Sequence, residues 1–177
     1  PPNPYEAVGD PIVPQKDSVE EQLFYAFRSG GTDVAEAAWL EVIENFPEKT
    51  YAKDIARRRL AMFYLDQARY RDASAIFDDF AQAPESEPEK QAFGRAGKVA
   101  LLSDLGQFQE SQREFLTALD PDDPNSLFKD LDDDEMRRKL RTAVYQNLAE
   151  LGLDRQNRWQ RFLNESRSEP GDAEDRS

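Results

Sequence analysis

The sequence of 177 residues contains no cysteine and no histidine. Without cysteine there are no disulfides, thiolate metal sites or cysteine nucleophiles, and the redox compartment cannot be inferred. Without histidine the commonest metal ligand and the usual general base are both missing. Glycine is scarce, with eight residues, and none of them forms a glycine-rich phosphate-binding motif. We therefore expect a protein that is not an enzyme and that has no metal site and no cofactor.

Basic residues are outnumbered, with 23 lysines and arginines against 36 acidic residues and a net charge of −13. Such a chain repels the phosphates of nucleic acid, so we expect no nucleic-acid partner. No apolar run approaches the roughly 20 residues that span a bilayer, so we expect no direct membrane insertion in this segment. The chain starts at Pro1 rather than at a methionine. This start is compatible with a missing N-terminal segment that tethers the protein to a membrane. The cell envelope or periplasm and the cytoplasm both remain open as locations.

The two ends of the chain differ in composition from its middle. Five prolines predict an extended linker over residues 1–16, and small and charged residues predict a disordered acidic tail over 166–177. Between them, apolar residues recur with helical period, and glycine or proline interrupts the pattern at regular intervals. Strand signals are absent, so the predicted fold class is all-α. Helices are expected at about 18–29, 32–46, 51–67, 70–83, 88–105, 108–119, 133–151 and 154–165.

The middle of the chain repeats itself. The large aromatic residues Trp39, Phe77 and Phe115 are 38 residues apart, and four residues before each lies a small one. These small residues are Ala35, Ala73 and Ser111. Prolines follow at a period of 37, at Pro47, Pro84 and Pro121. Self-similarity at this period is typical of solenoid proteins, in which each repeat packs on the next.

The repeat resembles the tetratricopeptide repeat (TPR). Residues 59–73 are similar to the end of the first helix, the turn and the start of the second helix of that family, and residues 106–111 give the same turn again. The resemblance implies a right-handed TPR-like α-solenoid over residues 17–165. It implies about four helical hairpins, at about 18–47, 51–84, 88–121 and 133–165, the last a capping hairpin. Residues 45–52 also resemble the bacterial cell-envelope subgroup of these proteins.

The family binds proteins or peptides in a concave groove lined by the first helix of each hairpin. Projection of the pattern onto this sequence predicts a groove that contacts an extended or helical peptide. An alternative is that several of its residues pack between hairpins instead. The asparagines of the family's carboxylate clamp are missing, so recognition of that kind is not expected. The predicted groove residues are Phe24, Phe27, Arg28, Arg58, Met62, Leu65 and Phe93, with Ala100 and Gln146 beside them.

Two charged features have simpler interpretations than binding. The basic runs 57–59 and 137–141 are expected to be solvated helix faces rather than phosphate sites. The acidic insert 120–135 opens with the spacing of a calcium loop at Asp130, Asp132 and Asp134. Glu135 then stands where that loop requires glycine, so a solvated acidic loop is expected instead.

These observations predict a non-catalytic interaction scaffold whose partner is a protein or peptide. The alternative is a structural or self-assembly module, with homo-oligomer formation, that positions a membrane-anchored or multidomain bacterial protein.

Overall fold

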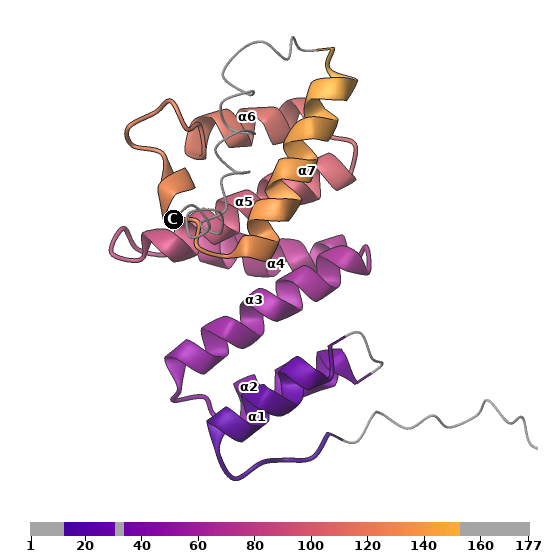
Figure 1. Ribbon diagram of the computed structural model, residues 1–177, viewed down its shortest axis with the longest axis vertical. Helices are drawn as coiled ribbons and strands as arrows, with labels where there is room; N and C mark the ends of the chain where they lie inside the picture. Colours follow the sequence, from indigo (N-terminus) through magenta and orange to yellow (C-terminus); the bar gives the residue numbers. More distant parts are fainter. Residues whose placement is uncertain (1–12, 31–33, 153–177) are drawn as a thin grey trace, which may run out of the picture. The chain divides into compact units, whose positions relative to one another are not determined.

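The computed structural model describes residues 13–30 and 34–152 of the chain (Figure 1). These residues form seven α-helices, one short 3-10 helix and no strand, which confirms the all-α prediction. The chain divides into two compact units, residues 1–69 and 70–177, and we describe each by itself. The helix expected at 154–165, the acidic tail and most of the linker lie outside the described residues.

The first unit contains α1 (Val19–Arg28), α2 (Ala35–Asn45) and α3 (Thr50–Asp66). Helix α2 packs against both α1 and α3. Small residues recur on the buried faces and let the helices approach closely. The larger side chains fill the space between them. Buried residues of these helices include Val19, Leu23, Ala26, Ala35, Ala38, Trp39, Val42, Ala52, Ala56 and Leu60.

Helix α5 (Pro88–Asp104) lies at the centre of the second unit. The unit also contains α4 (Tyr70–Ala81), α6 (Phe108–Ala118), the 3-10 helix η1 (Leu127–Asp130) and α7 (Asp134–Glu150). Helix α5 contacts α4, α6, α7 and η1, and α6 also contacts α7 (Figure 1). The core therefore surrounds α5. Its fully buried large side chains are Phe77, Phe93, Val99, Phe115, Leu119, Leu131, Met136, Leu140 and Val144.

Helices α4 and α5 approach each other closely because α5 carries glycine at the contact. A Cβ atom on Gly94 would lie 2.2 Å from the backbone nitrogen of Ala81 and 2.6 Å from the carbonyl oxygen of Phe77. A Cβ atom on Gly97 would lie 2.2 Å from the ring of Phe77. All three distances are shorter than real Cβ contacts, so a larger residue would force the α4 backbone to shift at Gly94 and the Phe77 ring to shift at Gly97.

The positions at which the helices end repeat with the same period as the sequence. Helices α1, α3 and α5 end at residues 28, 66 and 104, each 38 residues after the previous one. The turns after α3 and α5 have the same geometry. Ala68 and Gly106 both have positive φ, at 55° and 73°, and the next residue donates its N–H back into the helix in each case. This is the left-handed helix termination that glycine usually provides, and in the first turn alanine adopts it.

The residues that define the sequence repeat lie in the cores. The three small residues Ala35, Ala73 and Ser111 are buried, and so are the three aromatic residues four positions later in each case. A small side chain followed by an aromatic one four positions on therefore forms one buried stripe on each of α2, α4 and α6. The 38-residue spacing of the sequence corresponds to equivalent buried positions.

The third small residue is serine because it makes buried hydrogen bonds. The Ser111 hydroxyl donates to the carbonyl of Val99 at 2.8 Å, and the Asn147 side-chain amide donates to the Ser111 oxygen at 2.8 Å. Ser111 has one hydrogen to give, which goes to Val99, so Asn147 must be the donor of the second bond. Helices α5, α6 and α7 are thus joined by a polar contact inside the apolar core.

Two predicted segments, the acidic insert and the second hairpin, can be compared with the structure. The insert 120–135 is more ordered than the expected solvated loop, because η1 begins after the capping residue Ser126 and Leu131 is fully buried. The predicted hairpin 51–84 extends across the boundary between the two units. Its pairing therefore stays a prediction, as does the solenoid as a whole.

Candidate functional site

Helix α1 presents one buried face and one exposed face. The helix begins after Ser18, whose hydroxyl accepts a hydrogen bond from the backbone N–H of Glu21 at 3.3 Å. Its buried face consists of Val19, Gln22, Leu23 and Ala26. The exposed face is unusual because it carries two large aromatic side chains rather than only charged ones.

Phe24 and Phe27 are exposed phenylalanines, at 63% and 50%. Each ring has a guanidinium over it: that of Arg28 lies 5.7 Å from the Phe24 centroid and that of Arg59 lies 5.6 Å from the Phe27 centroid. Phe27 also makes an edge-to-face contact with Trp39, at 4.9 Å between the centroids. Cation–π contacts of this kind hold a guanidinium beside an aromatic surface.

A hollow of about 710 Å³ lies along the same face of α1. On one side it is bounded by Lys16, whose backbone N–H donates to the side-chain oxygen of Gln22 at 2.9 Å and whose ammonium lies 5.4 Å from the Tyr25 ring centroid. The hollow is open and combines two aromatic rings with charges of both signs. It is lined by Lys16, Glu20, Glu21, Phe24, Tyr25, Arg28 and Ser29.

The two acidic residues at the start of α1 have different surroundings. The Tyr51 hydroxyl donates to the Glu20 carboxylate at 3.1 Å. Loss of hydration and the neighbouring Glu20 carboxylate raise the pKa of Tyr51, so the phenol stays neutral. Glu20 is therefore held against α3, whereas the Glu21 carboxylate has no hydrogen bond or ion pair within the described residues.

The structure places the predicted groove residues in three environments. Phe24, Phe27 and Arg28 are exposed on α1, and Arg58 is partly buried on α3. Met62 and Leu65, also on α3, are only 3% exposed. Phe93 is completely buried in the second unit. The last three side chains have the burial of core residues, so little of their surface is open to a ligand.

Sequence reasoning missed three residues of this surface. Tyr25 follows Phe24 directly and lines the hollow, and Lys16 reaches it from the segment before the helix. Arg59 belongs to the basic run 57–59, for which the sequence predicts a solvated face, yet it lies over Phe27. The spacing of charges along α3 does not reveal which arginine faces α1, so only the packed structure could find this contact.

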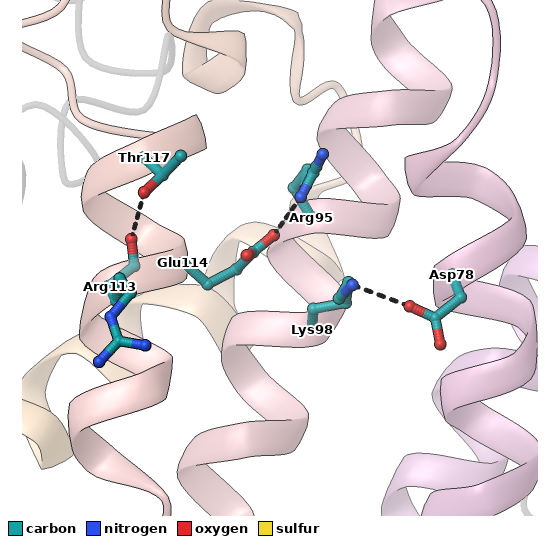
Figure 2. Close-up of polar contacts among 6 residues, drawn as sticks. All are labelled: Asp78, Arg95, Lys98, Arg113, Glu114 and Thr117. Carbon is teal, nitrogen blue, oxygen red and sulfur yellow. Dashed lines mark hydrogen bonds and ion pairs between the residues drawn. The ribbon is translucent and has the colours of Figure 1, made fainter.

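The second unit carries a set of ion pairs between neighbouring helices (Figure 2). Lys98 on α5 pairs with Asp78 on α4 at 2.8 Å, and Arg95 on α5 pairs with Glu114 on α6 at 2.8 Å. In each pair an α5 cation is matched by an acid of an adjacent helix. These cations are neutralised inside the unit, so this face is a weaker candidate for binding than α1.

The Asp78–Lys98 pair makes stability depend on pH. Burial raises the pKa of Asp78, but the Lys98 ammonium, the Ser74 hydroxyl and Arg95 together lower it below its ordinary 3.8. A lowered pKa means that the stabilisation is complete at neutral pH and is lost as pH falls below about 4. Both side chains are about a third or more exposed, so solvent limits the contribution to less than about 1 kcal/mol.

We therefore expect Asp78→Asn to lower the free energy of unfolding slightly at pH 7 and to have a smaller effect at pH 2.5. Urea unfolding of both proteins at the two pH values measures this difference. An equal difference at both values would show that the carboxylate charge of Asp78 contributes nothing to stability.

The acidic side chains of the described residues do not gather into a metal site. These residues contain no group of three acidic side chains placed to hold a metal ion, and this includes the acidic insert. None of their helices is both long and apolar enough to cross a membrane.

No protein-family model, curated protein or solved structure matches this chain. Its candidate function therefore depends on the chemistry of the α1 surface and on the repeat.

Proposed function

We propose that this chain is a TPR-like helical repeat protein that binds other proteins and catalyses no reaction. The repeat is supported by the 38-residue spacing of the ends of α1, α3 and α5 and by the matching turns at Ala68 and Gly106. It is supported further by the burial of the small and aromatic residues at that spacing. Repeats of this kind need only stack and present a surface, and a chain without cysteine or histidine suits that role.

The observation that carries the proposal is the exposed aromatic surface of α1. Phe24 and Phe27 are at least half exposed, and each has a guanidinium over its ring. Aromatic side chains, phenylalanine among them, and arginine are enriched in protein–protein interfaces. We assign the contact to this surface in place of the wider predicted groove, because Met62, Leu65 and Phe93 are buried.

A photo-crosslinking amino acid placed at position 24 tests the proposal. In an extract of the source cells, or in the purified protein, we expect covalent adducts from position 24. Mass spectrometry would then identify the captured protein. The matched control is the same amino acid at position 145, where Tyr145 is 38% exposed on α7 in the other unit.

The captured protein is then purified and titrated against variants. We expect Phe24→Ala to weaken binding by at least about tenfold, as for a residue at the centre of an interface. Tyr145→Ala should leave the affinity unchanged. Adducts from neither position, or equal affinity of the wild type and Phe24→Ala, would contradict a role for the α1 surface.

A further inference from the structure

The outward face of α1 carries an acid near one end and a base near the other. Glu21 and Arg28 are seven residues apart, which is close to two helical turns, so they lie on the same stripe of the helix. Phe24 and Tyr25 lie between them and line the same hollow. An acid, two aromatic rings and a base thus follow one another along about 10 Å of helix.

Both charges at the ends of this stripe are available to a second molecule. Among the described residues, neither the Glu21 carboxylate nor the Arg28 guanidinium takes part in an ion pair, and Arg28 lies only over the Phe24 ring. Glu20, in contrast, accepts a hydrogen bond from Tyr51 and is directed to α3. Within residues 13–30 and 34–152, the stripe therefore has one acid and one base that form no ion pair, separated by exposed aromatic surface.

A stripe of this kind is complementary in charge to the same stripe of a second copy that runs in the opposite direction. If two α1 helices pack antiparallel about a two-fold axis, Glu21 of one copy opposes Arg28 of the other, and Phe24 opposes Tyr25. One Glu21–Arg28 ion pair then forms at each end, and the aromatic rings of both copies lie between the two pairs. In a two-fold interface the same patch of both subunits meets itself, and this patch has the required order of charges.

We propose that the partner of the α1 surface is a second copy of this chain, bound through antiparallel α1 helices. The inference rests on the proposed function, because it names the partner of that same surface. A contact made mainly by one short helix belongs to the small interfaces, for which a dissociation constant on the order of 10–100 µM is expected. The net charge of −13 on each copy opposes the approach, so dimerisation is best measured near physiological salt, which screens this repulsion.

Charge reversal tests the geometry, with sedimentation equilibrium of the full chain as the measurement. Glu21→Arg places like charges opposite each other at both ends of the dimer, and so does Arg28→Glu. We expect each single variant to dimerise at least about tenfold more weakly than the wild type. An equimolar mixture of the two variants restores opposite charges at both ends, and we expect it to form a heterodimer of wild-type affinity.

Matched controls separate this effect from that of net charge. Glu110→Arg and Arg113→Glu make the same changes of charge at two exposed residues of α6, and we expect each to dimerise like the wild type. Circular dichroism checks that all four variants fold. Should either α1 variant unfold, Phe24→Ser provides the second test, because removal of the central ring should also weaken the dimer at least tenfold.

The outcomes separate this inference from the proposed function. A wild-type chain that stays monomeric at several times the expected dissociation constant overturns the dimer. So does a mixture that associates no better than the single variants. If position 24 then crosslinks to a different protein, the α1 surface still binds a partner and only the self-association is wrong. If it crosslinks to nothing, both proposals fail.

Discussion

Replacement of Phe93 by alanine is expected to lower the free energy of unfolding by about 3–5 kcal/mol. Phe93 is completely buried, and its ring lies 5.9 Å from that of Phe77 and 5.5 Å from that of Phe80, measured between centroids. The two neighbours come from α4 and Phe93 from α5, so the substitution removes the aromatic contact between these helices. It also leaves a cavity that the surrounding core can fill only in part.

Urea unfolding followed by circular dichroism measures this loss, with Phe24→Ala as the matched control. Phe24 is the most exposed phenylalanine among the described residues, and its truncation should change stability by no more than about 0.5 kcal/mol. The pair separates a core role from a groove role, because a groove residue would affect binding and leave stability nearly unchanged. A Phe93→Ala protein as stable as the wild type would show that the α4–α5 core is packed differently.

Gly94→Ala is expected to destabilise the protein by about 3 kcal/mol, the upper end of the usual cost of overpacking. A loss of stability would be informative, because alanine in place of glycine inside a helix normally stabilises a protein by about 0.5–1 kcal/mol. Here the new methyl group would lie 2.2 Å and 2.6 Å from backbone atoms of α4. Backbone atoms cannot rotate away, so α4 and α5 would have to move apart.

Gly97→Ala is the matched comparison, since its methyl group would meet the side chain of Phe77 and no backbone atom is among its closest contacts. The smaller Phe77→Leu side chain should therefore recover part of the stability lost in Gly97→Ala. It should recover little of that lost in Gly94→Ala. Thermal unfolding of the single and double variants gives both coupling energies. Equal recovery at the two positions would show that the backbone contact at Gly94 does not limit the packing.

The helices could be predicted from the sequence because local signals determine them. Apolar residues at helical spacing and terminating glycines and prolines gave the described helices with ends close to those of the structure. The buried stripe from Ala73 to Phe77, and its equivalents 38 residues away, could also be found in this way. These features depend on residues close together in the chain.

The surface was predicted only in part, for a physical reason. Helical periodicity shows which residues share a face, but it does not show what packs against that face. Phe24 and Phe93 therefore looked alike in the sequence, and one is exposed while the other is completely buried. The bond between Ser111 and Asn147 joins residues 36 apart, and the cation–π contact of Arg59 with Phe27 joins two different helices. Contacts of this kind depend on tertiary packing.

The equal spacing of the ends of α1, α3 and α5 limits how the length of this chain can change during evolution. Each residue added inside a helix turns everything after it by about 100°, because an α-helix has about 3.6 residues per turn. One such insertion before Gly94 would rotate that glycine away from α4. A whole block of 38 residues keeps every later residue in phase. We therefore expect the gain or loss of one or a few residues inside α3 or α5 to disturb the packing, whereas a change of 38 residues would keep the helix ends in phase.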